Sequence, residues 1–172
     1  MNFFEIFDFE PAFDLDVNTL SARYKNLQRA FHPDQYASAN ESQKLLALRK
    51  ATEINDAYAT LKSATSRAEY LLKLAGLDIS HETTTVKDPS FLMQQMEYRE
   101  RLEDISALSD PYDAIVAFEE ELEAEQAELE ALIGRELKSA HYEQAANAVR
   151  KLKFVNKLQT ELERLEDEAS EI

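Results

Sequence analysis

Residues 29–38 read RAFHPDQYAS, and they set the point at which a long helix has to end. This stretch places a proline directly after residues with helical spacing, and two polar side chains, His32 and Asp34, flank that proline. Because proline lacks a backbone N–H and pushes the preceding residue out of the α conformation, a helix that reaches Phe31 has to end here. Two interpretations are open: an ordinary helix stop in a polar loop, or a loop shaped for recognition by a partner.

Upstream of this loop, the sequence predicts a helix over about residues 17–31 with one apolar face. Apolar side chains recur every three or four positions along it, at Leu20, Tyr24, Leu27 and Phe31. Asp16 or Asn18 is a suitable N-cap for it. Lys25 and Arg29 lie four residues apart on nearly the opposite face, with Arg23 on the flank. The sequence therefore predicts a helix with a basic outer face leading into the loop.

Downstream of the loop, a second long helix is predicted over about 41–62. It carries these apolar residues at helical spacing: Leu45, Leu48, Ala51, Ile54, Tyr58 and Leu61. A short apolar helix within residues 3–9 and a fourth helix over 63–76, stopped by Gly76, complete this part. Residues 1–76 are thus expected to form a domain of four helices, with the two longest joined by the loop.

The second half of the chain predicts another helical domain. Residues 77–89 are polar, contain a run of threonines and end in Asp-Pro, which is typical of a linker. Three helices are then expected over 90–172: one over about 90–108, one starting at Asp110-Pro111, and one over about 140–168. The expected fold is all-α, an N-terminal four-helix domain plus a C-terminal three-helix bundle, in keeping with only 2 glycines and 4 prolines.

Composition and charge exclude several function classes. The net charge is −15, of which −1 falls on residues 1–76 and −14 on residues 77–172, so nucleic acid and anionic membranes are not expected partners. There is no cysteine, hence no disulfide or thiolate-bound metal, and we expect neither a metal site nor a cofactor. The acidic start resembles no export signal, and no apolar run approaches the ~20 residues of a membrane span, so the expected location is the cytoplasm.

The helix expected over 90–108 carries two apolar stripes. One is an ordinary core stripe, formed by Phe91, Tyr98, Leu102 and Ile105. The other is formed by Leu92, Met93 and Met96, with Glu100 among them. Either another helix covers this second stripe, or it is an exposed binding surface, for which methionine is well suited. The acidic run of residues 119–130, together with Arg150, Lys151 and Lys153, is expected to be a solvated face.

Three function classes are open for the loop. His32 and Asp34 are a possible acid–base pair, but nothing in the sequence supplies a nucleophile elbow, a phosphate loop or a metal-ligand set, so an enzyme is disfavoured. A structural or scaffolding protein, in which His-Pro-Asp is merely a turn, is the main alternative to a protein whose loop is recognised.

The setting of the tripeptide favours recognition, because His-Pro-Asp joins a helix with a basic face to a longer partner helix. This arrangement resembles the J-domain, found in co-chaperones that stimulate ATP hydrolysis by DnaK-like chaperones. The resemblance extends to the HscB family, J-domain co-chaperones of iron–sulfur cluster biogenesis that carry a second helical domain. It covers nearly the whole chain, through LQRAFHPDQYAS (27–38), INDAYATLKSATSRAEYLL (54–72), DPSFLMQQMEYRERLEDI (88–105) and AANAVRKLKFVNKL (145–158).

The resemblance implies two partners and two sets of site residues. A J-domain over residues 1–76 is expected to bind an HscA or DnaK-like ATPase chaperone through His32, Pro33, Asp34, Arg23, Lys25 and Arg29. The domain over residues 90–172 is expected to bind the iron–sulfur scaffold IscU through Leu92, Met93, Met96, Glu97, Glu100 and Phe154. One departure is Gln35, where many J-domains carry a basic residue after the tripeptide. Phe154 also lies close to Leu158 on the helical wheel, so core packing is its other expected role.

Overall fold

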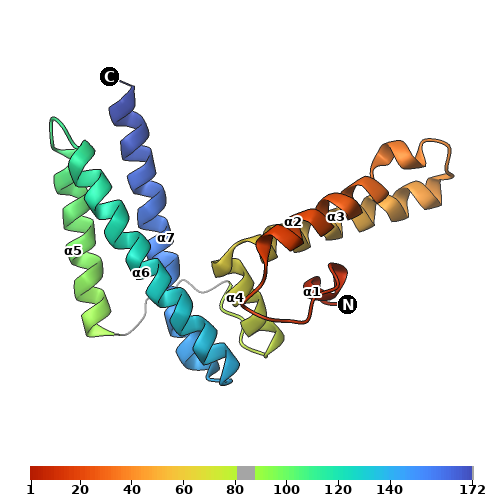
Figure 1. Cartoon of the computed structure of the whole chain (residues 1–172), viewed down its shortest axis with the longest axis horizontal. Helices are drawn as coiled ribbons and strands as arrows, with labels where there is room; N and C mark the ends of the chain where they lie inside the picture. The colour runs from red at the N-terminus through yellow and green to blue at the C-terminus, as the bar shows by residue number, and fades with distance from the viewer. Residues whose placement is uncertain (81–87, 172) are drawn as a thin grey trace. The chain divides into compact units, whose positions relative to one another are not determined.

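The computed structural model describes residues 1–80 and 88–171. All regular structure within these residues is helical, so the prediction of an all-α protein is confirmed (Figure 1). The chain divides into two compact units, Met1–Asp78 and Ile79–Ile172. Of the segment expected to be a linker, residues 81–87 lie outside the described residues.

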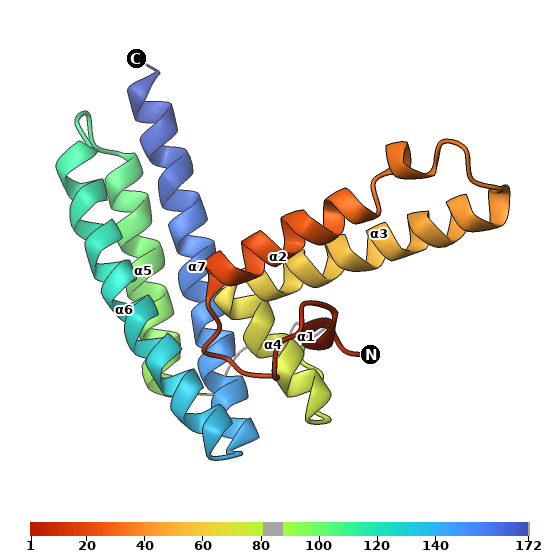
Figure 2. The ribbon, with the colours of Figure 1, turned by 45° about the vertical axis from the view of Figure 1, so that its right-hand side comes forward.

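The first unit is built on an antiparallel pair of long helices. Its helices are α1 (Phe3–Ile6), α2 (Val17–Ala30), the 3-10 helix η1 (Pro33–Tyr36), α3 (Glu41–Lys62) and α4 (Ala64–Leu74). In two views α2 and α3 lie side by side, joined at one end by the segment that contains η1 (Figures 1 and 2). Asp16 caps α2 by accepting hydrogen bonds from the backbone N–H groups of Asn18 and Thr19. Asn40 and Gln43 form a capping box at the start of α3.

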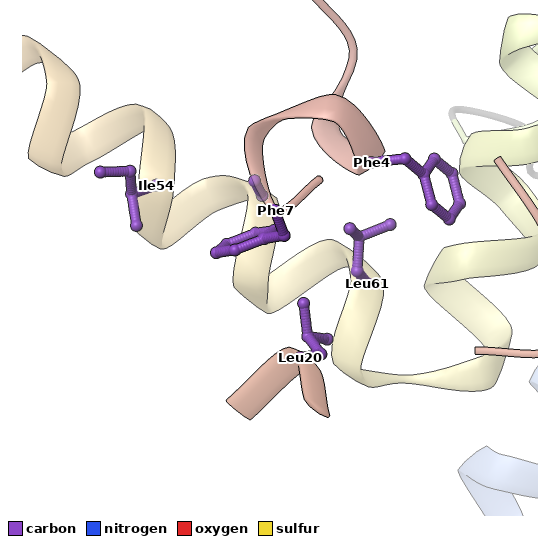
Figure 3. Close-up of a cluster of buried hydrophobic side chains, with 6 residues drawn as sticks. Phe4, Phe7, Leu20, Ile54 and Leu61 are labelled. Atoms are coloured by element: carbon purple, nitrogen blue, oxygen red, sulfur yellow. The ribbon is translucent and has the colours of Figure 1, made fainter. Parts of the chain in front are cut away.

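Aromatic residues of the N-terminal segment fill the core of this unit. Phe4 and Phe7 pack with the aliphatic side chains that α2 and α3 turn inward (Figure 3); the fully buried members are Phe4, Phe7, Leu20, Ile54, Ala57 and Leu61. The backbone N–H of Phe3 donates to the Tyr70 hydroxyl at 2.9 Å, and the two rings stack with centroids 4.7 Å apart. The N-terminal segment is thus fastened across α3 and α4, where it closes the core.

The inward series expected along α3 holds only in part. Leu45 and Leu48, which begin that series, are exposed, whereas Ile54 and Leu61 are buried. The physical reason is length: α2 has 14 residues and α3 has 22, so the first turns of α3 lie opposite η1 rather than α2. The expectation of plain loop after Pro33 also needs correction, because Pro33–Tyr36 form η1.

The end of α4 follows the sequence prediction. Gly76 has a φ of +96°, a conformation that side-chain-bearing residues rarely adopt. The N–H of Leu77 donates to the carbonyl of Leu72 at 2.8 Å, and that of Gly76 to Lys73 at 3.0 Å. These two hydrogen bonds are those of a Schellman motif, so glycine ends the helix as expected.

The second unit is a three-helix bundle. It consists of α5 (Pro89–Ser106), α6 (Tyr112–Lys138) and α7 (Tyr142–Ser170), which lie alongside one another in both views (Figures 1 and 2). The largest buried side chains of α6 are Ile115, Phe118, Leu122 and Ile133. One predicted boundary is wrong: α6 begins at Tyr112, and Pro111 rather than Asp110 occupies the N-cap position, without a capping side chain.

Arg67 is a buried cation in the first unit, with 7% of its surface exposed. Its guanidinium donates to the carbonyl oxygens of Phe13 and Leu61, each at 2.7 Å, and lies over the Phe13 ring. Arg67 therefore ties the loop before α2 to the end of α3. Nothing in the local sequence indicates this role, because Phe13 lies 54 positions away.

We predict that Arg67→Ala destabilises the protein by about 3 kcal/mol. The substitution leaves without a partner two carbonyl oxygens that accept charge-assisted hydrogen bonds in the unaltered protein. Urea denaturation followed by circular dichroism measures the loss. Arg49→Ala, at an exposed position of α3, is the matched control and should change stability by less than about 0.5 kcal/mol. Equal losses in the two variants would contradict the structural role of Arg67.

Candidate functional site

The His-Pro-Asp segment lies at the end of the α2–α3 pair, away from α1 and α4 (Figure 2). His32 is the N-cap of η1, with extended backbone angles of φ −65° and ψ 140°, and Pro33 occupies the first position of η1. The Nδ1 atom of His32 accepts the backbone N–H of Asp34 at 3.2 Å. This hydrogen bond holds the imidazole ring in place relative to the turn.

The same bond fixes the tautomer of a neutral ring. Because Nδ1 accepts this hydrogen bond, a neutral His32 ring carries its proton on Nε2, which remains a donor. The side chains of His32 and Asp34 are 54% and 90% exposed, and Nδ1 lies 3.6 Å from the Asp34 carboxylate. The turn thus presents a hydrogen-bond donor and a carboxylate on a rigid proline-containing segment, in an exposed setting that suits recognition better than acid–base catalysis.

The basic residues of α2 separate into two groups. Lys25 and Arg29 are exposed on the helix that leads into the turn. Arg23 is half-buried: it donates to the backbone carbonyls of Phe7 and Asp8 at 2.8 and 3.0 Å, and its guanidinium lies over the Phe9 ring. Arg23 thus holds the N-terminal segment against α2, a role that sequence reasoning missed.

The second apolar stripe of α5 is exposed. Leu92, Met93 and Met96 are 41%, 64% and 72% exposed, and we call these three residues the α5 patch. Glu97 and Glu100, also exposed, lie on the same helix beside them. The sequence left open whether another helix covers this stripe or whether it is exposed. None of the described helices of the second unit covers it, so the first interpretation is wrong for this unit.

The opposite side of α5 explains this exposure. Phe91, Tyr98 and Ile105 are buried, as the core stripe predicts, and Leu102 is half-buried. The Tyr98 hydroxyl donates to the Glu125 carboxylate on α6, and burial together with this carboxylate raises the pKa of Tyr98, so the hydroxyl stays protonated. Arg99 pairs with Glu161 on α7 at 2.6 Å. These contacts fix the rotation of α5, and the patch faces outward as a result.

Phe154 and Lys151 of α7 support the start of α5. The Phe154 ring packs edge-on against Phe91 with centroids 5.7 Å apart, and the Arg99 guanidinium lies over it. Lys151, expected to be merely solvated, pairs with Asp88 at 3.2 Å, and this hydrogen bond holds the pKa of Asp88 below its usual range. Both contacts join residues more than sixty positions apart, so no local signal predicts them.

A groove between α5 and α6 borders the α5 patch. Met93 and Glu97 line it from α5; Glu125, Glu128, Leu132 and Arg135 line it from α6. Part of the acidic run expected to be only a solvated face therefore forms the wall of a concave surface. Apolar side chains beside carboxylates suit a partner surface that combines apolar and basic groups.

In the parts of the chain that the structure describes, no cluster of His, Asp and Glu side chains is arranged to hold a metal ion. Likewise, no helix among the described residues is long and apolar enough to cross a membrane.

Comparison with known proteins identifies the family. Residues 87–163 match the family model described as the HSCB C-terminal oligomerisation domain. The Co-chaperone protein HscB homolog of Shewanella loihica is 51% identical over 170 residues, which cover 97% of this chain and 98% of that protein. The chain belongs to the HscB family of co-chaperones. Because this family is a class of co-chaperones, the chain is not an enzyme.

Solved HscB structures agree with the fold. The chaperone HscB from Vibrio cholerae has a TM-score of 0.88 and 44% identity, covering 98% of this chain and 99% of its own. The human co-chaperone HscB has a TM-score of 0.88 and 29% identity, covering 95% of this chain and 81% of its own. The expected combination of a J-domain and a C-terminal helical bundle is thereby confirmed.

Proposed function

We propose that this HscB-family chain binds an IscU-type iron–sulfur scaffold protein, delivers it to an HscA-type chaperone of the DnaK class, and stimulates ATP hydrolysis by that chaperone. The observation that carries the proposal is the presence of two exposed sites of different chemistry, one in each compact unit. The His-Pro-Asp turn is polar and rigid, whereas the α5 patch is apolar with an acidic border. Two such sites on one chain suit a protein that connects two partners.

The chaperone site comprises the turn and the basic face of α2. The Nε2–H of the exposed His32 side chain and the exposed carboxylate of Asp34 form complementary hydrogen bonds with the chaperone, while Pro33 keeps both at a fixed separation. Lys25 and Arg29 attract an acidic chaperone surface. Because Gln35 is uncharged, this electrostatic attraction comes from α2 and not from the residue after the tripeptide. Arg23 contributes its charge from the flank, where it also stabilises the N-terminal segment.

The scaffold site comprises the α5 patch with Glu97 and Glu100. The three apolar side chains lose solvent on docking, and the carboxylates select a partner with basic groups beside its apolar surface. Phe154 acts mainly by supporting Phe91 beneath the start of α5. The iron–sulfur cluster is then cargo of the scaffold, because this chain has no cysteine to hold it.

Domain roles follow from these sites. Residues 1–76 act as the J-domain, 77–89 as a linker and 90–172 as the client-binding domain. The cytoplasm is the proposed location, in keeping with the expectation from the sequence. Nucleic acid is not a partner of so acidic a chain.

Replacing His32 by Gln is expected to abolish stimulation of the chaperone ATPase while leaving the melting temperature nearly unchanged, because an exposed side chain adds little to stability. Single-turnover ATPase assays and thermal melts measure the two effects. His141→Gln, at an exposed histidine of the second unit, is the matched control and should stimulate normally. Full stimulation by the His32 variant would overturn the assignment of the turn.

Charge reversal by Arg29→Glu is expected to slow association with the chaperone, and high salt should shrink its difference from the unaltered chain. Stopped-flow binding at several salt concentrations measures this dependence. Arg164→Glu makes the same change in net charge at an exposed position of α7 and should have little effect. A defect of equal size at all salt concentrations would contradict electrostatic steering by α2.

Truncating Leu92, Met93 and Met96 together to Ala is expected to weaken scaffold binding by ~2 kcal/mol or more, because buried apolar anchors dominate interface energy. Stability should fall by less than the several kcal/mol that emptying three core sites costs. Calorimetric titration with the scaffold and thermal melts test both points. Leu108→Ala, at an exposed leucine of the same unit, is the control. Unchanged scaffold binding in the folded triple variant would show that the scaffold docks elsewhere.

A further inference from the structure

The sulfur atoms of the chain are concentrated at one surface. The sequence contains no cysteine and only three methionines, Met1, Met93 and Met96. None of the three is in the core, and both internal ones belong to the α5 patch. Any oxidation of sulfur in this protein beyond its N-terminal residue therefore falls on the proposed scaffold site.

Exposure makes these two thioethers accessible to oxidants. Met93 and Met96 are each more than half exposed, whereas a buried methionine is protected by its packing. A methionine sulfur gives an electron pair to one oxygen of a hydroperoxide, the O–O bond breaks, and an S–O bond forms. With hydrogen peroxide the products are the sulfoxide and water, so the sulfur is oxidised and the peroxide is reduced by two electrons.

The sulfoxide changes docking more than folding. In the free protein its oxygen lies in water, so the bundle has no reason to unfold. On docking, the oxygen loses that water and needs a hydrogen-bond donor. The adjacent carboxylates of Glu97 and Glu100 are acceptors and cannot supply one, and in the docked state they engage the basic groups of the proposed partner. Docking against a partner surface that fits apolar thioethers then becomes less favourable in free energy, because the sulfoxide oxygen is buried without a hydrogen bond.

We propose that Met93 and Met96 form an oxidation-sensitive site, at which conversion to sulfoxides by a peroxide releases the scaffold. Methionine sulfoxide reductases restore binding, with a dithiol as the two-electron donor; the dithiol becomes a disulfide and the sulfoxide oxygen leaves as water. This inference rests on the proposed scaffold function of the α5 patch. It makes client recognition respond to peroxide directly on the co-chaperone, without a thiol.

The test treats the full chain with hydrogen peroxide, locates the sulfoxides by peptide mass spectrometry, and titrates the chain with a purified IscU-type scaffold before and after treatment. Oxidation at both internal methionines should weaken binding at least ~10-fold with unchanged helicity and melting temperature. Treatment with reductases for both sulfoxide epimers should restore the original affinity.

Two variants identify the responsible residues. Met1→Leu should remain as sensitive to peroxide as the unaltered chain. In the Met93→Leu/Met96→Leu variant, affinities measured before and after peroxide should agree, whatever their absolute value. Failure of the untreated chain to bind the scaffold would refute the proposed function itself. Binding that is equally tight before and after complete oxidation of Met93 and Met96 would refute only the oxidation-sensitive site, and so would a loss that the reductases cannot reverse.

Discussion

The backbone constraint at Pro33 is the feature on which the rest of the first unit depends. Its ring excludes an α conformation at His32 and removes the N–H that a continuing helix would need. The chain therefore leaves α2, passes through η1 and returns as α3. The reversal pairs two amphipathic helices around Leu20, Ile54 and Leu61, and it leaves the polar turn outside the core. One constraint thus produces both the fold of the unit and the exposure of its proposed site.

The second unit separates stability from recognition on one helix. The side of α5 that carries Phe91 and Tyr98 is buried, and contacts to α6 and α7 fix its rotation. The α5 patch remains exposed to solvent, because the opposite side of α5 already makes the contacts that pack this helix against α6 and α7. A helix held in this way offers a preorganised apolar surface, so little conformational entropy is lost when a partner docks. The same separation allows Met93 and Met96 to change chemically without loss of the fold.

Short-range sequence patterns predicted those features of the structure that neighbouring residues determine. The stop at Pro33, the glycine C′ of α4 and the existence of a second apolar stripe on α5 follow from backbone geometry and helical spacing. The exposure of that stripe was one of two interpretations that the sequence left open, and the packing of the bundle decides it. Contacts between distant segments escaped prediction: Arg23 proved to hold the carbonyls of Phe7 and Asp8, and Lys151 to pair with Asp88. The exposure of Leu45 and Leu48 was missed for a related reason, because helical periodicity does not reveal where a shorter partner helix ends.

Under the proposed function, one chain must carry both sites in order to couple scaffold and chaperone. This requirement is tested by mixing His32→Gln with the Leu92/Met93/Met96→Ala variant and measuring scaffold-dependent stimulation of the chaperone ATPase at low scaffold concentration. Each variant leaves the other site intact, so the mixture contains both sites, but on different molecules. We expect the ATPase stimulation by the mixture to stay as far below that of the unaltered chain as the stimulation by either variant alone. Recovery of full scaffold-dependent stimulation by the mixture would contradict this requirement.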